Sequence, residues 1–95
     1  MYRWLSLNQV LKYENEMIKE NVSNVARSHD GFLGEYKKYK TSNIMKKAKV
    51  PDENIYWETK RNAFIARTLP AYEKNPTYRR WLSLVAWAYM PTILH

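Results

Sequence analysis

Residues 81–90 read WLSLVAWAYM, a run whose only polar side-chain groups outside the indoles are the Ser83 hydroxyl and the Tyr89 phenol. A helix that is apolar on every side has to be buried on every side. The proline at position 91 disfavours helix at the residue before it, so this helix should end at Met90. The run therefore predicts a buried C-terminal helix inside a compact all-α domain.

Trp81 and Trp87 of this run should project from opposite sides of the helix. They are six residues apart, which places them about 240° apart at roughly 100° per residue. Two surfaces must cover them, and a chain of 95 residues has limited area for that. Either the other helices of the chain surround this helix, or one face packs on a second copy, as a homodimer, or on another partner. The candidate partner-contact residues are Trp57, Arg79, Arg80, Trp81 and Trp87.

Upstream, helical patterns predict a bundle of four to five helices in one domain, residues 1–95. Ser6 and Gln9 form a capping box, and apolar residues follow at helical spacing up to the stop at Gly31. The stripe consists of Leu7, Leu11, Ile18, Val22 and Val25. Further helices are expected at residues 32–40, from Thr41 or Ser42 to 49, from 51 to about 68, and from 76 to 90, with a loop at 71–75.

Composition narrows the class of protein. Two glycines and four prolines are too few for a many-stranded sandwich. There is no cysteine, which removes disulfides and thiolate metal sites and fits a reducing compartment. No run is long and apolar enough for a membrane span, and the N-terminal residues do not resemble a secretory signal. We therefore expect a cytoplasmic protein with no membrane partner.

Charge is distributed unevenly along the chain. Residues 1–35 hold four basic and five acidic side chains, whereas residues 36–95 hold twelve basic and four acidic ones, for a total of +7. The segment from Tyr36 to Val50 has six lysines and no acidic residue. Such a segment indicates a polyanion or an acidic protein surface as partner. The predicted contact residues are Tyr36, Lys37, Lys38, Tyr39, Lys40, Lys46, Lys47, Lys49, Lys60, Arg61 and Arg67.

Tyrosines alternate with lysines at the start of this segment. Tyr36 and Tyr39 lie among Lys37, Lys38 and Lys40, as expected where bases stack on aromatic rings beside a charged groove. The alternative is that both tyrosines face the core and the lysines are merely solvated.

Residues 41–60 resemble the helix-turn-helix superfamily in part. Residues suited to its buried positions stand at Ile44, Ala48, Val50 and Ile55, and the resemblance implies that the second helix enters a major groove. The sequence departs from that pattern because Met45 replaces a small residue, Lys49 the turn glycine, and Glu58 an apolar residue. The alternative is two helices that merely adjoin.

Acidic residues at the start of the second helix argue against base reading. Asp52 and Glu53 would repel phosphates at the leading end of that helix. The lysines would then contact backbone phosphates without reading sequence.

Catalytic motifs are missing from the sequence. There is no glycine-rich phosphate loop and no H-E-x-x-H pair, and the two histidines have no partners at metal-ligand spacing. We expect a non-enzymatic protein without cofactor or metal. Two functions remain: binding of nucleic-acid phosphates, or an adaptor or inhibitor that docks on another protein, as phage or mobile-element accessory proteins do.

Overall fold

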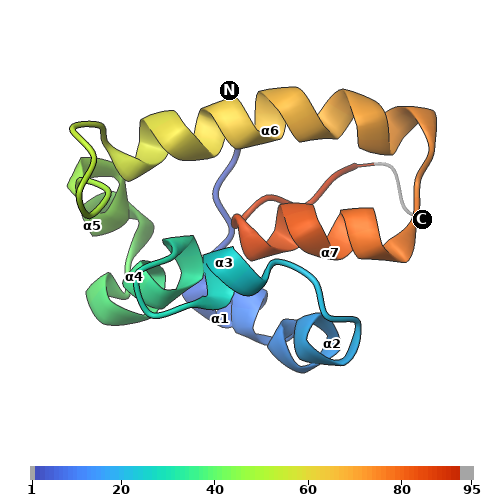
Figure 1. The fold of residues 1–95 in the computed structure, drawn as a ribbon, viewed down its shortest axis with the longest axis horizontal. Helices are drawn as coiled ribbons and strands as arrows, with labels where there is room; N and C mark the ends of the chain where they lie inside the picture. Colours follow the sequence, from blue (N-terminus) through green and yellow to red (C-terminus); the bar gives the residue numbers. More distant parts are fainter. Residues whose placement is uncertain (1, 93–95) are drawn as a thin grey trace.

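The computed structural model describes residues 2–92. Within them the only regular elements are helices and one isolated bridge between Lys49 and Tyr56, joined by turns and loops. The predicted all-α class is confirmed. The described residues hold more helical segments than the four to five expected. They are α1 (Leu7–Leu11), α2 (Glu14–Lys19), α3 (Asn24–Arg27), α4 (Phe32–Tyr39), α5 (Ser42–Lys47), α6 (Trp57–Lys74) and α7 (Tyr78–Ala86) (Figure 1).

Helix α7 lies between α6 on one side and α2 on the other (Figure 1). The Trp81 ring packs edge-on against Tyr13, with 4.9 Å between the ring centroids. The Trp87 ring stacks on Phe32 and on Phe64, each at 4.8 Å. The predicted buried C-terminal helix is therefore present, and residues of the same chain cover both tryptophans. It ends at Ala86 rather than Met90, because Trp87 and Ala88 leave the helical conformation.

The single N-terminal helix expected up to Gly31 is three short segments. The capping box is present, with the Gln9 amide donating to Ser6 Oγ at 3.2 Å and the Ser6 amide to Gln9 Oε1 at 2.8 Å. Asn21 and Ser23 adopt left-handed φ values of 55° and 57°, which interrupt the helix. The breaks bury Met17 and Val22 and leave Val25 83% exposed, so the residues of the expected stripe do not share one buried face and the single helix was wrong.

Helices α4 and α5 lie where the sequence predicts them. Thr41 caps α5 by accepting the Ile44 amide at 3.3 Å. The helix expected from Pro51 is wrong, because residues 51–55 are turns and bends and Asp52 has a φ of 63°. Two backbone bonds close this loop: the Val50 amide donates to the Ile55 carbonyl and the Trp57 amide to the Ala48 carbonyl, both at 2.9 Å.

The helix-turn-helix interpretation is also wrong. That motif joins its helices through a turn of about three to four residues, whereas residues 48–56 form a closed loop between α5 and α6. Ile44 is 49% exposed and Ile55 is exposed as well, although the motif would bury both. Of the four positions only Val50 is fully buried.

Helix α6 runs through Pro70 to Lys74, although the sequence predicted an end near residue 68 and a loop at 71–75. Proline removes one backbone donor, and Pro70 lies on an exposed face. Tyr72 in the last turns is fully buried, and its packing offsets the lost hydrogen bond. The next helix, expected from residue 76, begins at Tyr78 and is capped by Thr77, which accepts the Arg80 amide at 3.2 Å.

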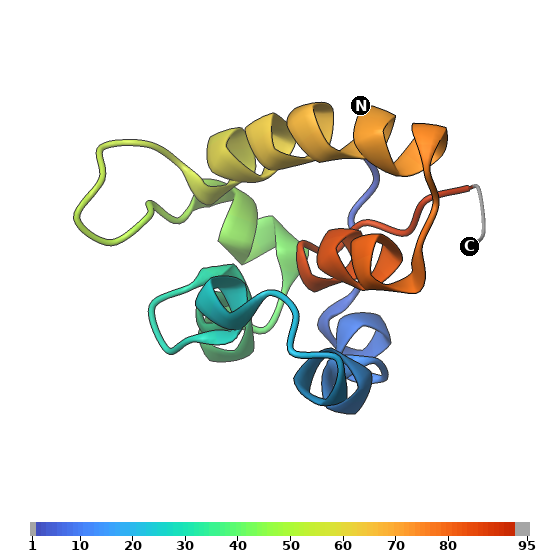
Figure 2. The ribbon, with the colours of Figure 1, turned by 45° about the vertical axis from the view of Figure 1, so that its right-hand side comes forward.

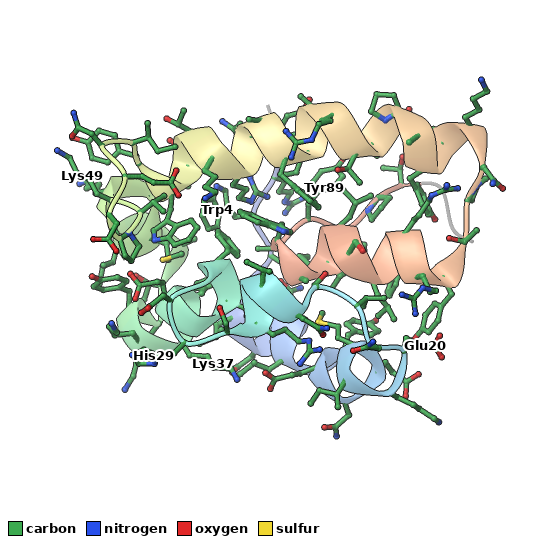
Figure 3. The ribbon with its side chains drawn as sticks, viewed as in Figure 1. Trp4, Glu20, His29, Lys37, Lys49 and Tyr89 are labelled. Carbon is green, nitrogen blue, oxygen red and sulfur yellow. The ribbon has the colours of Figure 1, made fainter. Side chains whose placement is uncertain are left out.

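Arg61 joins α6 to both ends of the described chain. Its guanidinium donates to the carbonyls of Trp87 (2.7 Å), Ala88 (2.9 Å), Arg3 (3.0 Å) and Tyr2 (3.1 Å). The guanidinium lies 4.3 Å from the centre of the Trp4 ring. Trp4 is labelled beneath α6 in Figure 3. The Arg61 side chain is 0% exposed, so the prediction that Arg61 contacts an anionic partner is wrong.

The charge of Arg61 is not neutralised by a carboxylate. Among residues 2–92 no ion pair to it is present, and carbonyl dipoles satisfy its donors instead. Burial lowers the pKa of Arg61 to about 10, which still leaves the guanidinium charged at neutral pH.

Among residues 2–92, none of the helices combines the length and the apolar character that crossing a membrane requires.

Candidate anion-binding surface

The lysine-rich segment folds into α4 and α5, which lie at one end of the molecule (Figure 1). Phe32, Leu33 and Tyr36 form the buried face of α4, and Met45 is the buried residue of α5. Four of the lysines lie on the other faces of these helices, and the remaining two, Lys40 and Lys49, follow the ends of α4 and α5. The lysines do not form one continuous face, because Lys37 lies at the edge beside α1 and Lys49 at the outer end of the molecule (Figure 3).

Two of the predicted lysines are held in ion pairs. Lys37 Nζ pairs with Glu14 Oε2, which ties α4 to α2. Lys38 Nζ lies 2.9 Å from Glu35 Oε2, a carboxylate that is almost completely buried. The hydrogen bond and charge of Glu35 raise the pKa of Lys38. These two ammonium groups neutralise carboxylates of the same chain and contribute less to the field outside it.

Four lysines of the segment have no carboxylate partner among residues 2–92: Lys40, Lys46, Lys47 and Lys49. Lys40 is exposed at the end of α4. Lys46 Nζ lies 6.0 Å from the centre of the Trp4 ring, and Lys47 borders a shallow groove beside Tyr39. Lys49 Nζ lies 3.4 Å from Asn54 Oδ1.

The two tyrosines of the segment have different roles. Tyr36 is fully buried and donates its hydroxyl to the Leu5 carbonyl at 2.7 Å, and burial raises the pKa of that hydroxyl. Its predicted contact with a base is therefore wrong. Tyr39 is half-buried and lines an open groove of about 370 Å³ with Asn43, Ile44, Lys47 and Ala48.

Tyr56 is an accessible ring that the predicted contact set lacks. It is 48% exposed, and Lys49 Nζ lies 5.7 Å from its ring centroid. The antiparallel bridge between residues 49 and 56 places the pair together. Sequence reasoning did not place Tyr56 beside Lys49, because a continuous helix from Pro51 would have separated these two side chains.

The other predicted contact residues are engaged within the fold. Lys60 pairs with Glu53 at 2.6 Å, and the Arg67 guanidinium lies 5.9 Å from the Phe64 ring centroid. Trp57 and Trp81 are buried, so neither ring is exposed on the outer surface.

Three further residues of the partner-contact prediction also contact this chain. Arg79 donates to the Glu20 carbonyl, and Arg80 donates to the Asn75 carbonyl at 2.8 Å. Trp87 is half-buried and stacked between two phenylalanines. Within the described chain, this set therefore serves mainly to pack the core and hold loops.

We refer to the remaining accessible residues as the basic surface. It consists of Tyr39, Lys40, Lys46, Lys47, Lys49 and Tyr56. Its ammonium groups can approach phosphate oxygens, and its two phenol rings can support stacked bases. Comparison with protein-family models, curated proteins and solved structures finds no match to this chain.

Proposed function

We propose that this protein binds the phosphate backbone of nucleic acid through the basic surface, without reading base sequence. The observation that carries the proposal is the group of four lysines that have no carboxylate partner among residues 2–92, at the end of the molecule formed by α4 and α5. Because no carboxylate of the described residues pairs with them, their field is available to an external anion.

Single strands suit this surface better than a duplex. Tyr39 and Tyr56 offer accessible aromatic area beside the lysines, and base stacking on such rings tolerates any sequence. A duplex hides the faces of its bases and would use the lysines alone.

Replacing Lys40, Lys47 and Lys49 together with glutamine should weaken binding to a labelled single strand about tenfold or more at roughly 50 mM salt. The slope of log affinity against log salt should become shallower by about 2, because each lost phosphate contact removes roughly 0.7. Fluorescence anisotropy over a salt series measures both quantities.

The matched control replaces Lys12, Lys19 and Lys74 with glutamine. These lysines are exposed and belong to other parts of the fold: Lys12 directly follows α1, Lys19 ends α2 and Lys74 ends α6. The substitution removes the same net charge. It should leave most of the affinity intact. If both triple variants bind equally, total charge governs binding and the basic surface is not the site. If the unaltered protein does not bind at low salt, the proposal is wrong.

Replacing Tyr56 with alanine separates stacking from charge. Loss of a stacked base costs about 1–3 kcal/mol, so affinity for a single strand should fall roughly fivefold or more, while affinity for a duplex stays nearly constant. Tyr56 is an exposed ring, so thermal unfolding should change little. An equal loss on both nucleic acids would contradict stacking on this residue.

A second candidate function is docking on an acidic protein surface. Ile44 and Tyr56 are exposed beside the same lysines, and an apolar group ringed by charge is typical of protein interfaces. Affinity capture with and without nuclease treatment distinguishes the two functions. Nucleic-acid binding predicts that co-purifying material is lost on treatment, whereas an adaptor keeps its partner.

A further inference from the structure

A cavity of about 260 Å³ opens between the turn before α4 and the loop that precedes α6. Figure 2 shows both segments projecting to the same side of the molecule. Phe32, Trp57 and Trp87 line the cavity and pack on one another. The cavity is slightly smaller than the range of about 300–1,000 Å³ usual for small-molecule sites, which suits a single side chain.

The charge around this cavity is opposite to that of the whole chain. Asp30, Asp52, Glu53 and Lys60 line it, three carboxylates against one ammonium, whereas the chain as a whole carries +7. Glu53 is already paired with Lys60 at 2.6 Å. Asp52 has no ion pair among residues 2–92, and Asp30 has only a 4.0 Å approach from His29. Two carboxylates therefore remain for an external cation.

Trp57 adds an aromatic ring to the same wall. Lys60 Nζ already lies 5.9 Å from the centroid of the Trp57 ring, so this ring accommodates a cation.

A second groove of about 320 Å³ adjoins the cavity, because Val25, Ala26 and Trp87 line both. Its other lining residues are Ser23, Asn24, Phe64 and Ser83. The highly exposed Val25 lies where the two meet. A chain that enters the cavity with one side chain could continue along this groove.

We propose that the cavity binds an arginine or lysine side chain of a partner polypeptide. The alkyl stem packs on the aromatic wall, the charged end meets Asp30 and Asp52, and the partner's backbone continues along the adjoining groove. This site is separate from the basic surface and does not depend on the proposed binding of nucleic acid.

The test is a titration with the blocked tripeptide acetyl-Gly-Arg-Gly-amide, followed by the indole N–H signals of ¹⁵N-labelled protein. We expect saturable shifts of the Trp57 and Trp87 signals and small shifts of the Trp81 signal. The same peptide with norleucine in place of arginine should bind at least about tenfold more weakly, because it keeps the alkyl stem and loses the charge.

Asp30→Asn and Asp52→Asn should each weaken the arginine peptide several-fold, and the double variant about tenfold. Asparagine tolerates the left-handed backbone of Asp52, so the loop should keep its form. Glu73→Gln is the matched control, because it removes one carboxylate from an exposed position on α6 and should leave peptide affinity unchanged.

Three results would overturn the assignment. Equal binding of the norleucine and arginine peptides would show that charge has no role. Equal losses in Asp52→Asn and Glu73→Gln would show that the carboxylates of the cavity are not the site. Equal binding of n-butylguanidinium and the arginine peptide would show that the cavity takes a free cation and makes no use of the peptide backbone.

Discussion

Arg61→Met is expected to lower the free energy of unfolding by about 3–5 kcal/mol, a large part of what a domain of this size has. Methionine fills a similar volume but donates no hydrogen bond. Four backbone carbonyls, two near the N-terminal end and two after α7, then lose the guanidinium as a donor. Of these, the Ala88 carbonyl still accepts from the Leu5 amide at 2.8 Å. The midpoint of urea denaturation should fall accordingly.

The partners of Arg61 explain why an apolar replacement does not rescue stability. A buried ion pair can sometimes be replaced by apolar side chains at little cost, since both charges can be removed. Here the acceptors are peptide carbonyls, which no substitution removes. Arg61→Lys should also be destabilising, because an ammonium group cannot reproduce the planar fork that spans both chain ends.

Arg67→Met is the control for this experiment. Arg67 lies on the same helix, is exposed, and has its guanidinium 5.9 Å from the Phe64 ring centroid, so its loss should change stability by less than about 0.5 kcal/mol. Limited proteolysis should cut residues 2–6 sooner in Arg61→Met than in Arg67→Met, because Arg61 holds that segment. Equal denaturation midpoints for the two variants would show that the carbonyls find water and that Arg61 is dispensable.

Local signals in the sequence predicted the fold where local chemistry decides it. The Ser6 capping box, the Thr41 cap and the apolar run after residue 80 all correspond to structure. The errors occur where tertiary packing overrides a local rule. Pro70 does not end α6 because the buried Tyr72 holds the helix beyond it.

The candidate site was only partly predictable for a related reason. Sequence alone identifies a lysine-rich segment, and four of its six lysines have no carboxylate partner among residues 2–92. It does not show that Glu14, far along the chain, neutralises Lys37. Arg61 resembles a surface cation in sequence because its partners are main-chain carbonyls, which have no signature in side-chain identity.

Gly34→Ala should destabilise the protein, against the rule that alanine is the better helix former. Intrinsic propensity alone predicts a gain of about 1 kcal/mol for this change inside a helix. A methyl group at Gly34 would lie 2.5 Å from the His29 carbonyl oxygen and 2.8 Å from its carbon, and closer still to the Ser28 oxygen. All of these atoms are backbone, so α4 must move away from the preceding turn.

We expect the cost of this overlap to exceed the gain from helix propensity by about 1–3 kcal/mol, so the net effect is destabilising. Ala66→Gly provides the opposite exchange at an exposed position of α6, where only propensity acts, and should destabilise by about 1 kcal/mol. Thermal unfolding of the two variants then shows whether each exchange raises or lowers stability. If glycine is favoured at position 34 and alanine at position 66, close backbone packing requires Gly34. A Gly34→Ala protein that is more stable than the parent would mean that α4 can shift freely, and the tight contact between α4 and the turn at residues 28–29 would be wrong.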